Sequence, residues 1–190
     1  TVSSVMLPDA LRLKQMVADL LLLARADESG VPLHVEDVDL DDIVAAEATR
    51  LDTVTGHTVV AHIEAVRVRG DREKLARAVR NIADNAARHT EDRVLMTMRR
   101  DPLLRTVTVM IHDNGTGVAD ADKARITKRF VRLDNSRHRQ SGGSGLGLAI
   151  VSEIIRAHGG DVVITDSPEG GVAVGFRLPA DNVAPDLPTI

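Results

Sequence analysis

Apolar residues recur at helical spacing in four stretches of the chain and alternate with polar residues in several shorter ones. The predicted helices cover residues 8–26, 40–54, 71–89 and 145–157. The predicted strands cover residues 31–35, 58–63, 65–69, 94–100, 105–112, 161–165 and 172–178. This order of elements predicts an α+β fold in which helices cover one face of a sheet.

The first helical stretch has its apolar residues on a narrow seam, which favours a partner helix. The seam consists of Leu13, Val17, Leu20 and Ala24. Residues 28–32 are rich in turn formers, so we expect the helix to end there and a domain boundary near residue 30. The alternative, in which this helix packs on the following domain, stays open.

An acidic cluster lies just before the second helical stretch. It consists of Glu36, Asp37, Asp39, Asp41 and Asp42. Carboxylates favour the positive end of a helix, and Asp39 followed by Asp42 resembles a capping arrangement. A metal site is the less favoured alternative. Further along, the strands 58–63 and 65–69 are expected to be joined by a tight turn.

The third helical stretch carries two polar amides on successive turns. Its apolar stripe consists of Leu75, Val79, Ile82 and Ala86. Asn81, Asn85 and Arg88 share another face. Asparagine is a poor helix former, and its amide oxygen suits Mg²⁺, while an arginine one turn on suits phosphate. A solvated polar face is the alternative.

Two glycine-containing segments follow strands or precede helices. The segment 113–117, Asp-Asn-Gly-Thr-Gly, comes after a strand and is either an ordinary turn or a carboxylate held over a pocket. The segment 141–150 runs from a glycine-rich loop into a helix, which favours an anion such as phosphate at the helix N-terminus. A flexible loop that caps a helix is the alternative.

Composition narrows the class of protein. The 190 residues suffice for one core with an appendage, and 43% hydrophobic with 27% charged residues is ordinary for a globular chain. There is no cysteine, so disulfides are excluded. The net charge of −4 argues against bulk nucleic-acid binding, although residues 123–140 are strongly basic. No apolar run approaches the roughly 20 residues that span a bilayer, and we expect the first 30 residues to form a regular helix and not a secretory signal.

The Asn-x-x-x-Asn of the third helix, the Asp-x-Gly-x-Gly after a strand and the Gly-x-Gly-x-Gly that opens a helix occur in that order. This ordered set resembles the ATP-binding domain of sensor histidine kinases, whose fold is related to gyrase and mismatch-repair ATPases. The resemblance covers essentially the whole chain. It implies a Bergerat-type two-layer α/β sandwich, with a mixed, largely antiparallel sheet covered by three helices and preceded by one long helix.

The resemblance also implies site roles for the helix and the first glycine segment. Asn85 would bind Mg²⁺ with Asn81 as support, and Arg88 would touch the phosphates of ATP. His89 stands where the family has an aromatic residue beside the adenine. Asp113 would accept the adenine exocyclic amine.

A second group of implied roles belongs to the lid and the glycine loops. Gly115 and Gly117 would let the lid open, Phe130 would anchor it, and Arg132 and Arg137 would reach the polyphosphate. The residues expected to lie along the phosphates are Gly143, Ser144, Gly145, Leu146 and Gly147. We expect residues 142–145 to belong to a mobile lid and the chain from Gly147 to be fixed helix.

Residues 11–26 resemble the second helix of the family's dimerisation and phosphoacceptor hairpin. The domains implied are a truncated hairpin and linker over 1–30, the ATP-binding domain over 31–180 and a tail over 181–190. No histidine of this chain has the sequence context of the family's phosphoacceptor histidine, so we expect the chain to bind ATP without phosphorylating itself. The resemblance also implies a cytoplasmic fragment. The implied partners are a response regulator and, in the full-length protein, a second copy; nucleic acid is not expected, and a membrane only through upstream segments.

Two other functions are weighed against the kinase. A hydrolytic gyrase-type ATPase uses a Glu one turn before the Mg²⁺-binding Asn as general base, and Asn81 cannot take a proton from water. A degenerate, non-enzymatic dimerisation or docking module would keep the fold without binding ATP. A serine kinase of the anti-sigma type shares the motifs but not the preceding helix.

Overall fold

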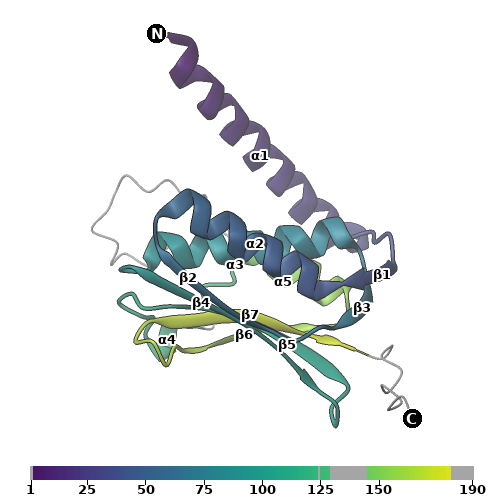
Figure 1. Cartoon of the computed structure of the whole chain (residues 1–190). Coiled ribbons are helices and arrows are strands. Elements are labelled where there is room, and N and C mark those ends of the chain that lie inside the picture. Colours follow the sequence, from purple (N-terminus) through teal and green to yellow (C-terminus); the bar gives the residue numbers. More distant parts are fainter. Residues whose placement is uncertain (1, 124, 129–144, 181–190) are drawn as a thin grey trace.

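The computed structural model describes residues 2–123, 125–128 and 145–180. Its main body has two layers, with three helices over one face of a five-stranded sheet (Figure 1). The covering helices are α2 (Leu40–Thr55), α3 (Arg72–His89) and α5 (Gly147–Ala157). A short helix just before the basic segment, α4 (Asp120–Lys123), was not predicted. The predicted two-layer α+β sandwich is confirmed.

The sheet has the strand order β2-β4-β5-β7-β6. The strands are β2 (Thr58–Ile63), β4 (Arg93–Asp101), β5 (Thr106–Asp113), β6 (Asp161–Asp166) and β7 (Val172–Pro179). Only β2 and β4 are parallel, and the other neighbours are antiparallel, so the sheet is mixed as expected. Alternate residues of the central strands face the helices and are fully buried, among them Met96, Val109 and Phe176.

A separate two-stranded sheet corrects two predictions. β1 (Glu36–Asp39) pairs antiparallel with β3 (Arg67–Gly70), with buried Val38 opposite buried Val68. Residues 31–35 form no strand, so the strand predicted there was wrong. The predicted hairpin of 58–63 with 65–69 was also wrong, because β2 joins the large sheet beside β4. Local alternation identified the strands but not their non-local partners.

The residues of the acidic cluster form strand β1 and the first turn of α2, but Asp39 does not make the expected side-chain cap. Asp39 directly precedes α2, yet its side chain caps no N–H. Its Oδ1 instead accepts a hydrogen bond from Arg67 Nε at 2.6 Å across the β1–β3 pair. Within the described residues, no group of three or more His, Cys, Asp or Glu side chains is arranged to hold a metal ion.

The first helix, α1 (Val2–Ser29), projects from the body and is longer than predicted (Figure 1). Its C-terminal part packs on the domain, because Leu23 and Ala26 are buried and Asp19 forms an ion pair with Arg77 of α3. The predicted seam is largely exposed, with Leu13 63% and Val17 49% accessible. The helix therefore combines a packed base with an outward apolar face, and the domain boundary near residue 30 stays a prediction.

Asp71 anchors the beginning of α3. Its Oδ1 accepts the Lys74 N–H at 3.0 Å, and its Oδ2 accepts the His34 N–H at 3.0 Å and Lys74 Nζ at 2.7 Å. Burial raises the pKa of this carboxyl, but the bonds from Lys74 and His34 outweigh it and lower the pKa from 3.8 to about 2. The linker that carries His34 is thereby fastened to the domain.

We expect Asp71→Asn to reduce the free energy of unfolding by about 2 kcal/mol near pH 7, since the amide keeps the cap and loses the charge. The folded pKa is depressed, so this contribution is present above pH 4 and is lost as pH falls toward 2. The deficit should shrink by about half at pH 3. Urea unfolding from pH 7 to 3 measures it, with Asp52→Asn on the exposed side of α2 as control. A deficit independent of pH would contradict the charge-based explanation.

Candidate functional site

The two asparagines of α3 have different surroundings. Asn81 Nδ2 donates a hydrogen bond of 3.3 Å to the carbonyl oxygen of Gly147, the first residue of α5. Asn81 therefore connects α3 to the N-terminus of α5. Asn85 is half-buried one turn later, and within the described chain its side chain makes no hydrogen bond. Its amide oxygen is thus available to a ligand.

The N-terminus of α5 begins two residues later than predicted. Gly145 lies in the left-handed region with φ of 70° and turns the chain, and Leu146 precedes the helix with 1% of its surface exposed. The Leu146 side chain belongs to the core, so only its main chain can face a ligand. Its carbonyl oxygen accepts the Ile150 N–H at 2.9 Å. A buried anchor thus fixes the start of the helix next to Asn81.

Asp113 ends β5 and is 2% exposed. Its Oδ1 accepts two main-chain hydrogen bonds, from the Gly115 N–H at 2.9 Å and from the Val172 N–H at 3.3 Å. Gly171 packs directly on it, because a Cβ on Gly171 would lie 2.1 Å from Oδ1. No hydrogen bond to Oδ2 is made by the described residues. A fixed carboxylate with one unengaged oxygen can accept a single donor from a ligand.

The loop after β5 is fastened to the end of α3. A Cβ on Gly115 would lie 2.0 Å from the His89 carbonyl oxygen, so this glycine is required by close main-chain approach. Asn114 Oδ1 accepts the Thr90 hydroxyl at 2.6 Å and the Glu91 N–H at 3.1 Å. Gly115 is therefore part of a rigid contact, whereas Gly117, with φ of 73°, is the residue that turns the chain.

His89 lies at the end of α3 beside this loop. Its side chain is exposed, but partial removal of the ring from water lowers its pKa, and the neighbouring Arg88 lowers it further. Asp113 acts in the opposite direction without reversing the shift. The ring is therefore neutral at pH 7 and has an apolar face for a flat ligand. Arg88 is exposed, and among the described residues it has no ion-pair partner.

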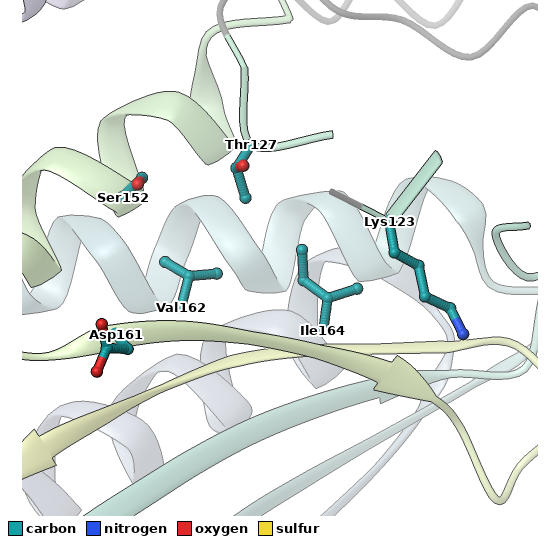
Figure 2. Close-up of a pocket in the computed structure, with 6 residues that line it drawn as sticks. All are labelled: Lys123, Thr127, Ser152, Asp161, Val162 and Ile164. Atoms are coloured by element: carbon teal, nitrogen blue, oxygen red, sulfur yellow. The ribbon is translucent and has the colours of Figure 1, made fainter. Parts of the chain in front are cut away.

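The structure brings the described site residues together at one end of the helix layer. Asn81 contacts the start of α5, Asn85 lies one turn further along α3, and the end of α3 meets the loop after Asp113. Residues 142–144 of the expected mobile lid lie outside the described residues. So do the remaining predicted site residues, which are Phe130, Arg132, Arg137, Gly143 and Ser144. A separate groove beside β6 is lined by none of the predicted site residues among those described (Figure 2).

Gly171 and Asn114 contact this site and were not predicted as site residues. Gly171 follows Gly170 directly before the strand predicted over residues 172–178, and such a glycine pair is a signal of close main-chain approach. Asn114 lies within the Asp-Asn-Gly segment. Asparagine is common in turns, so its presence there does not by itself indicate a site residue.

The fold agrees with the comparisons to known proteins. The family model described as histidine kinase-, DNA gyrase B- and HSP90-like ATPase matches residues 70–182. The chain is 38% identical over 178 residues to the probable sensor histidine kinase TcrY of Mycobacterium tuberculosis, covering 92% of this chain and 37% of that protein. It is 32% identical over 174 residues to the signal transduction histidine-protein kinase BaeS of Escherichia coli, covering 90% of this chain and 37% of that protein.

Solved structures give the same result. Full-length ShkA in complex with AMPPNP superposes with a TM-score of 0.79 at 28% identity, over 93% of this chain and 37% of that chain. The mycobacterial sensor histidine kinase MprB superposes with a TM-score of 0.68 at 27% identity, over 78% of this chain and 99% of that chain.

The chain belongs to the family of histidine kinase-, DNA gyrase B- and HSP90-like ATPases, and it carries the catalytic ATP-binding domain of a sensor histidine kinase. The resemblance inferred from the ordered motifs is confirmed. The chain spans little more than a third of the length of the curated relatives reported above. None of the described helices combines the length and hydropathy needed to cross a bilayer.

Proposed function

We propose that this chain binds Mg²⁺-ATP between α3, the start of α5 and the end of β5. In the full protein it transfers the γ-phosphoryl group to a histidine side chain on a hairpin helix. The phosphoryl group then passes to an aspartate of a response regulator in the cytoplasm, and the exposed face of α1 pairs with a second copy. The observation that carries the proposal is Asp113: the Gly115 and Val172 N–H groups hold one of its carboxylate oxygens, and no described residue donates a hydrogen bond to the other.

Each described residue has a distinct role in this proposal. Asp113 accepts the exocyclic amine of adenine, and the neutral ring of His89 stacks on the base. The amide oxygen of Asn85 is a hard ligand that suits Mg²⁺, whose remaining ligands are phosphate oxygens and water. When bound, Mg²⁺ neutralises the charge that develops on the transferring phosphoryl group. Arg88 and the N-terminal N–H groups of α5 add positive potential for the same anion.

Arg132, Arg137, Gly143 and Ser144 are proposed to contact the polyphosphate, and Phe130 to anchor the segment that carries the two arginines. These roles rest on the family motifs alone. Gly145 and Gly147, which the structure does describe, bracket the buried Leu146 at the helix start. Their main-chain groups therefore have a fixed position from which to meet a phosphate.

Asn81 supports the kinase over the hydrolytic ATPase. Its amide donates to the Gly147 carbonyl, so it works as a tie between helices. It has no group that takes a proton from water, as a hydrolase requires at this turn of the helix. We therefore expect slow ATP turnover in the absence of an acceptor histidine.

The Asn85→Ala variant tests the metal role. We expect its affinity for a fluorescent ATP analogue in Mg²⁺ to fall about 10-fold, while its affinity in EDTA stays close to that of the unchanged protein. Titration in both buffers separates the metal contribution from nucleotide contacts. An equal loss in Mg²⁺ and EDTA would show that Asn85 contacts the nucleotide without a metal.

The reaction itself is tested by adding a segment of the full protein that contains the acceptor helix, with labelled ATP. The expected product is acid-labile phosphohistidine on that segment. Rapid steady release of phosphate without the added segment would favour the hydrolytic ATPase. Failure to bind any adenine nucleotide would favour the non-enzymatic module.

A further inference from the structure

β6 forms one edge of the five-stranded sheet, and within the described chain it pairs with β7 alone. Directly after β6, the Ser167 N–H donates to the Gly171 carbonyl oxygen at 2.9 Å. In an antiparallel ladder, successive residues alternate between facing the partner strand and facing away from it. Counting back from Ser167, the main-chain groups of Val162, Ile164 and Asp166 point away from β7. These three residues present N–H and C=O groups at the sheet edge.

A groove of about 380 Å³ lies next to the same residues (Figure 2). The side chains of Val162 and Ile164 point from β6 toward α5 and form its floor, and Ser152 and Thr127 lie opposite them (Figure 2). A strand added beside β6 would alternate in the same way, so every second side chain would enter this groove. A single extended segment can therefore hydrogen-bond the exposed N–H and C=O groups of β6 and at the same time fill the groove with its side chains.

The charges at the two ends of the groove differ. At one end, Lys123 Nζ is bound to Asp120 at 2.6 Å and to Asp166 at 2.7 Å, so its charge is already matched. At the other end, Asp161 is exposed, and the described residues give it no ion-pair partner. This end therefore favours a cation. β6 itself contains no lysine or arginine, so a second copy of β6 paired antiparallel at this edge would bring no cation to Asp161.

We propose that the β6 edge binds an extended peptide segment of a partner protein as a sixth strand. The segment places small apolar side chains in the groove over Val162 and Ile164 and a lysine or arginine beside Asp161. Main-chain hydrogen bonds supply the affinity, and the alternate side chains supply the specificity. This surface is separate from the nucleotide site, so its test does not depend on the proposed kinase activity.

The probe is a blocked six-residue peptide in which valine alternates with threonine and a lysine stands at each end. Added to the whole chain, it should slow hydrogen exchange at the amides of Val162, Ile164 and Asp166. The amides of Val163 and Thr165 face β7 and should be slow with or without it. The same peptide N-methylated at every residue keeps its side chains, loses its donors and should not bind.

Two neighbouring β-branched residues on opposite faces of β6 provide matched variants. Ile164→Thr removes apolar surface from the groove floor and should weaken peptide binding on the order of 10-fold. Val163→Thr makes the corresponding change on the face away from the helices and should leave binding within about twofold. If Ile164→Thr proves unstable, Ser152→Phe is the alternative variant. It fills the groove from α5 without altering β6 and should abolish peptide binding.

Several results would overturn the proposal. One is slow exchange of the Val162, Ile164 and Asp166 amides before peptide is added, which would mean that the edge is already covered. Another is protection that grows with protein concentration alone, which would assign the edge to a second copy. Equal binding by the Ile164→Thr and Val163→Thr variants, or no binding at millimolar peptide, would also refute it.

Discussion

The Asp113→Asn variant should lose about 100-fold or more in affinity for ATP while remaining folded. The asparagine Oδ1 can still accept the Gly115 and Val172 N–H groups, which hold the native carboxylate at 2.9 and 3.3 Å. The second oxygen becomes an NH₂ donor and meets the donor amine of adenine. Two donors then face each other in a buried position, where an unmade hydrogen bond is costly.

The same variant should gain a different base preference. Inosine triphosphate carries a carbonyl oxygen where ATP carries the amine, so the new NH₂ group can donate to it. We expect the variant to bind inosine triphosphate at least as well as ATP, whereas the unchanged protein prefers ATP. Competition against a fluorescent nucleotide measures both affinities, and thermal unfolding confirms that the variant is folded. Unchanged ATP preference in the folded variant would remove Asp113 from the base-recognition site.

Much of the fold follows from local patterns in the sequence. The stripe of Leu75, Val79 and Ile82 on α3 is fully buried, and the alternation along β4 and β5 gives the observed strands to within a residue or two. These elements are long enough for their period to stand out. β1 has only one buried residue, Val38, within an acidic segment, so no period is visible there.

What the sequence left open is mostly non-local. The parallel pairing of β2 with β4 and the pairing of β1 with β3 join segments that are far apart in the chain. Leu23 packs on the body of the domain, and Asp19 forms an ion pair with Arg77. The sequence does not show this packing, because the same apolar residues of the helix would suit a partner helix equally well. The turn-forming residues indicate where these helices and strands end, but not which helices or strands lie beside them.

The candidate site shows the same division. Ordered motifs marked Asn85 and Asp113 as candidate site residues, because their residue types carry the expected chemistry. The close approach of Gly171 to Asp113 and of Gly115 to His89 depends on where three separate segments meet. Gly115 was expected to let a lid open and is instead packed against a carbonyl oxygen. Close packing of this kind has no local sequence signal beyond the glycine itself.

The Gly171→Ala substitution should therefore lower both the free energy of unfolding and the affinity for ATP. The alanine Cβ would lie 2.1 Å from Asp113 Oδ1, which two main-chain hydrogen bonds hold in place, and 2.6 Å from the main-chain nitrogen of Gly115. Relief requires the carboxylate and the loop after β5 to move. We expect a loss of about 3 kcal/mol in the free energy of unfolding and no measurable ATP binding by the molecules that remain folded.

Two further glycines separate these effects. A Cβ on Gly175, within the strand β7 that follows Gly171, would lie 1.9 Å from the Val109 carbonyl oxygen, so Gly175→Ala should destabilise the sheet by a similar amount. Its folded fraction should still bind ATP, because the clash lies away from Asp113. A Cβ on Gly147 would lie 3.9 Å from Asn81, an ordinary contact, so Gly147→Ala should keep its stability. Urea unfolding gives the stabilities, and nucleotide titration corrected for the folded fraction gives the affinities. Equal affinity in the Gly171→Ala and Gly175→Ala proteins would mean that the position of the Asp113 carboxylate does not control nucleotide binding.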